Sequence, residues 1–202
     1  ALNVAVGYDA GLLMSTGVEN TIMGGLAGDA LTTGSYNIAI GQAALTTEDT
    51  GSKSTAVGYN ALAAQNFNGD ALNTAVGYFA GKSVSTGTHN TLMGGLSGQS
   101  LTQGNFNVAL GHGTLSAETL GDRNVAIGVN ALNAQNNTSD VDAYNVAVGY
   151  EAGILITTGV RNIIIGGHAG DALTIGNNNV AMGFKALSTS VDGDENVAIG
   201  YL

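Results

Sequence analysis

The chain repeats one short pattern of polar and apolar positions twelve times. Each copy starts with an Asn, or with a Ser in the fourth copy, continues with three small or branched residues that are mainly apolar, and ends with a Gly, as in NVAVG at residues 3–7. Alternation within the three apolar residues predicts a short extended segment with two sides. The first positions of the twelve copies are Asn3, Asn20, Asn37, Ser54, Asn73, Asn90, Asn107, Asn124, Asn145, Asn162, Asn179 and Asn196.

Successive copies lie 17 residues apart, except for steps of 19 and 21 residues after the fourth and eighth copies. A fixed period of this length predicts coils stacked on one another. We therefore expect an all-β, parallel β-solenoid of twelve coils, forming one domain over residues 1–202 with blocks at 1–72, 73–144 and 145–202. Stretches such as residues 59–65 have helix-favouring residues, but Gly-bounded units of 17 residues leave no room for ordinary helices and their turns.

Two apolar columns follow from stacking the copies. The residue before each Gly is aliphatic or Met, and we expect this column to fill the interior of the solenoid. The middle residue is Ala, or Ile or Leu in the second coil of each block, so the other side is apolar too. Segments such as residues 29–33 are expected to form a second strand in each coil.

Glycines mark the expected corners. The Gly that closes each copy supplies a turn conformation with positive φ, and Asn can form hydrogen-bonded ladders between neighbouring coils. A second Gly recurs three residues before most of the next copies. The closing glycines are Gly7, Gly24, Gly41, Gly58, Gly77, Gly94, Gly111, Gly128, Gly149, Gly166, Gly183 and Gly200.

Composition narrows the class of protein. A formal net charge of −10, from 5 basic and 15 acidic residues, opposes binding to nucleic acid. No apolar stretch is long enough to span a membrane, and the absence of Cys removes disulfides and thiolate metal sites. A thin solenoid with apolar columns exposes contiguous hydrophobic area, which predicts a symmetric homo-oligomer. The ends fall inside the repeat pattern, so we interpret the chain as a piece of a longer protein.

The sequence NVAIG, at residues 124–128 and 196–200, resembles the head repeat of trimeric autotransporter adhesins. The longer spelling, with TGxxNTxxG at residues 16–24 and 86–94 and Tyr-x-Ala after the Gly, is more similar to repeats of bacteriophage tail fibres and spikes. This resemblance implies a left-handed parallel β-roll with three chains side by side. The adhesin unit is usually shorter, near fourteen residues, and the chain has no visible neck, stalk, anchor or chaperone segment.

The two lengthened coils are the candidate binding regions, because insertions leave a solenoid as loops and loops can reach a partner. Each loop joins polar amides to one aromatic ring, a composition suited to sugars; a tolerated surface insertion is the alternative. The candidate binding residues are Gln65, Asn66, Phe67, Asn68, Asp70, Gln135, Asn136, Asn137, Asp140, Asp142 and Tyr144.

Other residues support structural interpretations. Tyr8, Tyr78 and Tyr150 occupy equivalent places four coils apart, and we expect them to seal corners or the seam between chains. The acidic residues lack calcium-loop spacing, so no metal is expected. The three His residues occupy different repeat positions, as expected of surface residues. Glu48 and Glu118 are too far apart for the carboxylate pair of a glycoside hydrolase, and broken ranks of Thr do not favour an ice-binding surface.

The sequence therefore favours a non-enzymatic shaft or receptor-binding segment of a trimeric phage tail fibre or spike, located in the virion. Its expected partners are its own copies and a bacterial surface glycan, with no cofactor, nucleic acid or membrane insertion of this segment. The head of a bacterial surface adhesin is the alternative, and a polysaccharide-degrading tail spike is the second alternative.

Overall fold

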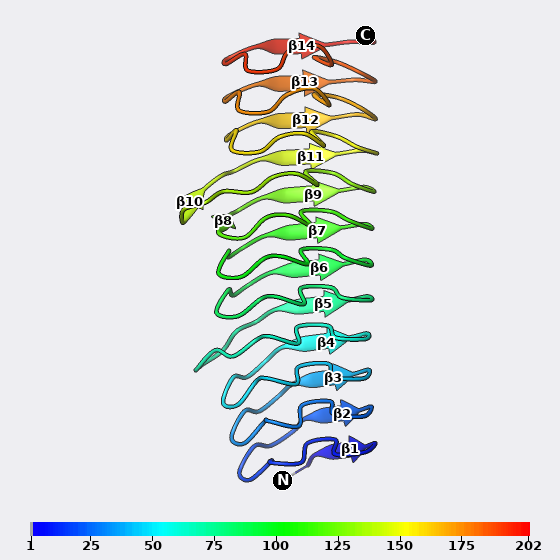
Figure 1. Ribbon diagram of the computed structural model, residues 1–202, viewed down its shortest axis with the longest axis vertical. Coiled ribbons are helices and arrows are strands. Elements are labelled where there is room, and N and C mark those ends of the chain that lie inside the picture. The colour runs from blue at the N-terminus through cyan, green and yellow to red at the C-terminus, as the bar shows by residue number, and fades with distance from the viewer. Residues whose placement is uncertain (1) are drawn as a thin grey trace.

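The computed structural model describes residues 2–202 as a rod of stacked coils, with the chain ends at opposite ends of the rod (Figure 1). No residue in this range is helical, and twelve coils each contribute one three-residue strand to a single sheet. The strands are β1 (Val4–Val6), β2 (Thr21–Met23), β3 (Ile38–Ile40), β4 (Thr55–Val57), β5 (Thr74–Val76), β6 (Thr91–Met93), β7 (Val108–Leu110), β9 (Val125–Ile127), β11 (Val146–Val148), β12 (Ile163–Ile165), β13 (Val180–Met182) and β14 (Val197–Ile199). The predicted all-β solenoid is confirmed.

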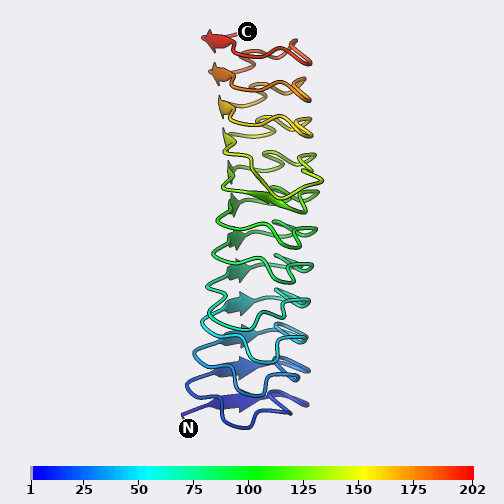
Figure 2. The same ribbon diagram turned by 90° about the vertical axis from the view of Figure 1, so that its left-hand side faces the viewer.

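Every neighbouring pair in this sheet is parallel and in the register of the repeat. Val108 in β7 pairs with Val125 in β9, and Leu110 pairs with Ile127. Equivalent side chains therefore lie one above another along the rod. The strands occupy one side of each coil, and turns form the other side (Figure 2).

The interior column is the middle residue of each strand, which corrects the expectation that the residue before Gly is buried. Ala39, Ala56 and Ala109 are among the fully buried middle residues, whereas the residues before and after them are partly exposed. The inward-pointing Asn fixes this phase, because side chains alternate along the strand and the second residue after Asn must also point inward. The aliphatic column before each Gly lies on the outer face of the sheet.

Core packing pairs large side chains with small ones. In the second coil a Cβ on Gly28 would lie 3.2 Å from Cδ1 of Ile22, so the large middle residue favours a Gly opposite it. In the third coil the pair is reversed, with Ala39 in the strand and a fully buried Leu45 in the turn. This exchange of volume keeps the narrow interior filled.

A buried Asn ladder runs along the rod and confirms the hydrogen-bonding role expected for Asn. At Asn107 the side-chain Nδ2 donates to the carbonyl of Gly121 at 2.9 Å, and Oδ1 accepts the backbone N–H of Asn124 at 2.9 Å. Each such amide therefore satisfies backbone groups of the next coil.

The prediction of a second strand in each coil is wrong. Residues 29–33 form turns and bends. Some of their backbone N–H groups donate hydrogen bonds within the same coil, such as Leu31 N–H to Gly28 O at 3.1 Å, and others donate to the next coil. Thr32 N–H, for example, donates to Asp49 O at 2.8 Å. The segment still joins the axial ladder without being extended.

The two lengthened coils leave the stack as expected. The first loop, residues 66–72, returns to the coil before it through a parallel bridge between Ser52 and Asp70. The second loop, residues 136–144, makes the equivalent contact as a two-stranded parallel sheet of β8 (Gly121–Asp122) and β10 (Val141–Asp142), which projects from the side of the rod in Figure 1.

Candidate functional site

Each inserted loop is anchored on a buried carboxylate. In the first loop Glu48 is fully buried and accepts hydrogen bonds from the Gly51 N–H at 2.7 Å, Gln65 Nε2 at 2.9 Å and the Phe67 N–H at 3.3 Å. No charged side chain is among these partners. The carboxylate is instead stabilised by amide donors from its own coil and from the loop.

The second loop repeats this arrangement with more donors around the fully buried Glu118. Its Oε2 accepts from Gln135 Nε2 and Asn137 Nδ2, both at 2.9 Å. Its Oε1 accepts from the backbone N–H groups of Thr119 (2.8 Å), Leu120 (3.1 Å), Gly121 (2.8 Å) and Asn137 (3.1 Å). The loop is therefore held where it leaves the rod.

Several of the candidate binding residues are buried in these networks and have a structural role. Gln65 and Gln135 are fully buried, and Asn137 is nearly so, because their amides complete the carboxylate networks. Glu48 and Glu118 are likewise enclosed by their own donors, so neither carboxylate faces a substrate in solvent. In other coils the same column holds apolar residues such as Leu31 and Leu101.

The remaining loop residues reach the surface. Asn66, Asn68 and Asp70 are exposed in the first loop, with Phe67 half-buried, and Asp140, Asp142 and Tyr144 are exposed in the second loop, with Asn136 half-buried. The two loops lie four coils apart, so the structure does not bring them into one site. Only the second loop joins a larger group of exposed side chains.

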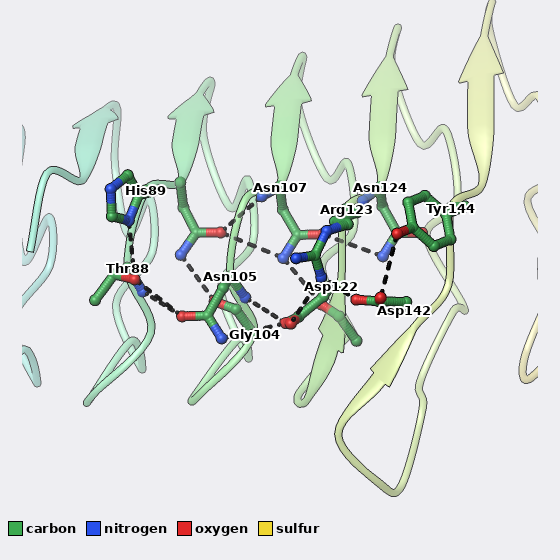
Figure 3. Close-up of polar contacts among 12 residues, drawn as sticks. Thr88, His89, Gly104, Asn105, Asn107, Asp122, Arg123, Asn124, Asp142 and Tyr144 are labelled. Atoms are coloured by element: carbon green, nitrogen blue, oxygen red, sulfur yellow. Dashed lines mark hydrogen bonds and ion pairs between the residues drawn. The ribbon is translucent and has the colours of Figure 1, made fainter.

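That group is a stack of rings and one guanidinium on four successive coils. His89 and Phe106 stack with ring centroids 4.8 Å apart, and Arg123 Cζ lies 5.1 Å from the Phe106 centroid and 5.8 Å from that of Tyr144. Phe106 and Tyr144 are both 47% exposed, and the Arg123 side chain is 38% exposed. We call His89, Phe106, Arg123 and Tyr144 the ring stack. Figure 3 shows His89, Arg123 and Tyr144 with their polar contacts.

Two carboxylates border the ring stack. Arg123 Nη1 forms an ion pair with Asp142, and the Tyr144 hydroxyl donates to Asp142 Oδ2 at 3.2 Å. Asp122 lies 3.7 Å from Arg123 Nη1 and accepts the Asn105 N–H at 2.6 Å. Burial raises the pKa of Asp122, the bonds from Asn105 oppose this shift, and the charge of Asp140 adds to it.

The first loop makes a matching ion pair. Lys53, the equivalent of Arg123 in the first block, lies 2.6 Å from Asp70 through its Nζ. The hydrogen bond and charge of Asp70 raise the pKa of Lys53. Thus each inserted loop returns one carboxylate to the basic residue that precedes a strand.

Aromatic residues also gather at the other edge of the sheet, after the closing Gly. Tyr59 and Tyr78 stack with centroids 5.5 Å apart, and Tyr150, His168, Phe184 and Tyr201 form a continuous row over the last four coils. A hydrogen bond to the Glu151 carboxylate raises the pKa of Tyr150. The spacing of the equivalent tyrosines does not reveal these contacts. The contacting rings belong to adjacent coils and occupy two neighbouring repeat positions.

Neither a metal centre nor a membrane span is evident within residues 2–202: no three His, Asp or Glu side chains cluster as metal ligands, and none of the chain forms a helix able to cross a membrane. The chain matches no known protein-family model, curated protein or solved structure. The fold and the ring stack therefore carry the functional argument.

Proposed function

We propose that this chain is a stiff segment of a homotrimeric fibre, of the kind that bacteriophage tails extend to a bacterial surface. The observation that carries the proposal is the unbroken stack of twelve parallel strands with a buried Asn ladder beside it. Bending such a rod requires breaking backbone bonds, amide bonds and an apolar layer in the same place. A shaft that holds a distal surface at a distance needs this stiffness.

Self-association is supported by the outer face of the sheet. Its two columns are the first and third residues of each strand, and none of these residues is charged. Several large members remain well exposed in one chain, including Ile38, Met93 and Ile163. A continuous apolar face of this kind is typical of a protein interface, and three chains meeting on it bury the face around one axis.

Recognition of a surface glycan is supported by the ring stack and by the two carboxylates that border it. Exposed ring edges, a guanidinium and carboxylates match the apolar faces and hydroxyl groups of sugars. The same surface would serve a bacterial adhesin, which is the alternative setting for this rod.

Light scattering with charge variants tests the proposed assembly. The wild type should have the mass of three chains of 20.1 kDa, and the variant V76E/V125E should be monomeric because it places carboxylates on the apolar face. The control T86E/Q103E adds the same charge at exposed turn positions and should remain trimeric. A wild-type monomer at low micromolar concentration would contradict the proposal.

A further inference from the structure

One edge of the sheet gathers basic and aromatic side chains in a single column. The column is the residue immediately before the first position of each repeat, which is Asn or, in the fourth coil, Ser54. From the fourth to the tenth coil this column is interrupted only by Leu72. We call its members the axial strip: Lys53, His89, Phe106, Arg123, Tyr144 and Arg161. The strip contains the ring stack and extends it in both directions, over roughly 29 Å at the usual strand spacing.

The backbone holds these six residues in one column. All six residues have positive φ between 51° and 61°, a conformation that non-glycine residues adopt rarely. All of them except Tyr144 also donate a backbone hydrogen bond to the coil before them, as in Arg123 N–H to Asn105 O at 3.0 Å and Arg161 N–H to Ala143 O at 2.7 Å. The backbone of the strip is therefore preorganised, which lowers the entropy lost when a ligand binds.

Most of the basic residues lie on this strip, although the chain is acidic. Three of the five Lys and Arg residues belong to it, in a chain with a net charge of −10. Lys53 and Arg123 are paired with loop carboxylates, whereas Arg161 is exposed and forms no ion pair within residues 2–202. Between the two arginines lies Tyr144, with its ring against Arg123. Two guanidinium groups therefore flank an exposed ring.

We propose that the axial strip binds an extended acidic polysaccharide lying parallel to the rod. The carboxylates of the polymer accept hydrogen bonds from Arg123 and Arg161, and its sugar rings lie against the exposed edges of Phe106 and Tyr144. Guanidinium forks suit planar carboxylates, and the separation of the arginines by two coils favours a chain of linked sugars over a single sugar. This inference rests on the proposed role in surface recognition and names the ligand class.

The test is affinity electrophoresis in native gels that contain alginate, polysialic acid or neutral dextran, at low salt. The variant R123Q/R161Q removes two charges from the strip. The matched control K82Q/K185Q removes two charges from lysines that lie over Phe79 and Phe184, outside the strip. Both double variants therefore have the same net charge, and light scattering checks that both keep the oligomeric state of the wild type.

An acidic polymer should retard the wild type, and R123Q/R161Q should weaken its binding by about tenfold or more, with the control changing by less than about twofold. Binding by the wild type to neither acidic polymer would overturn the proposal, as would equal weakening in the two variants or equal retardation by dextran. If the wild type is monomeric but still binds the acidic polymer through the two arginines, the fibre proposal is wrong and the proposal for the axial strip stands.

Discussion

Gln135 donates a 2.9 Å hydrogen bond to Glu118 one coil below it, inside the protein core. Its own Oε1 accepts Asn145 Nδ2 at 3.0 Å, which connects the carboxylate to the Asn ladder. Gln65 makes the same two contacts in the first block, with Glu48 and Asn73. A buried polar layer therefore stands where each long loop leaves the rod.

Removing the Glu118 carboxylate should destabilise the second loop and the coils around it. Glu118→Ala leaves six N–H contacts without their acceptor, and we expect a loss of at least about 3 kcal/mol in the free energy of unfolding. Glu118→Gln keeps one acceptor oxygen and should lose less. Denaturant unfolding measures the change, and the exposed charge control Asp140→Ala should stay within about 0.5 kcal/mol of the wild type. Equal effects of Glu118→Ala and Asp140→Ala would contradict the anchoring role.

The cost of breaking the Asn ladder should depend on its position in the rod. Asn107→Ala removes the bonds to Gly121 O and Asn124 N at a fully buried site, and should cost about 2 to 4 kcal/mol. Asn3→Ala removes similar bonds at the partly exposed first coil and should cost less. Hydrogen exchange should show faster opening of the coils next to Asn107. A larger effect at Asn3 than at Asn107 would contradict the expected dependence on burial.

Gly94→Ala should disrupt the stack, because Gly94 has a φ of 132° and a Cβ there would lie 2.5 Å from Gly111 O. The neighbouring Gly95 is less suitable as a control than Gly25, where a Cβ would meet nothing within 4 Å. We expect a clear drop in the melting temperature for Gly94→Ala and little change for Gly25→Ala, measured by circular dichroism. Similar melting temperatures for the two variants would contradict the close approach of the coils.

Asp122 should make the stability of the protein fall as the pH rises. Its folded-state pKa is raised above the ordinary value of 3.8, so the native state binds more protons than the unfolded state in the window just above that value. The contribution of this group is therefore favourable below 3.8 and is lost as the pH rises through the raised pKa.

Asp122→Asn keeps an oxygen acceptor for the Asn105 N–H and removes the charge. Its melting temperature relative to wild type should increase from about pH 3 to about pH 7. Asp192→Asn, at an exposed position, is the control and should show no such trend. A relative melting temperature of Asp122→Asn that falls over this range would contradict the assignment.

The period of the sequence was sufficient for the fold, the stacking of equivalent residues and the roles of Asn and of the closing Gly. The period alone did not show which side of each strand faces the interior. Alternation assigns residues to two sides of the strand, but both sides are apolar here. The inward Asn is one signal that Ala39 rather than Ile40 is buried. The size match between Ile22 and Gly28 was another available signal for the interior.

The loop residues were harder to interpret, because Gln and Asn are equally suited to bind a ligand and to satisfy a buried carboxylate. Glu48 and Gln65 occupy a repeat position that holds a buried Leu in other coils, and this shared position was the signal that they are internal. The axial strip is not evident within any single coil, because each coil contributes one of its residues. Their shared place before Asn becomes evident only when all repeat positions are aligned.

The backbone hydrogen bonds between coils, such as Thr91 N–H to Asn107 O at 2.8 Å, run along the rod. Tension applied to the two ends therefore acts on successive coils in series, so that one coil can detach while the others remain intact. Each 17-residue coil released would add roughly 60 Å of extended chain. A rod that resists bending would thus lengthen stepwise under a steady pull, absorbing mechanical work while both ends stay attached.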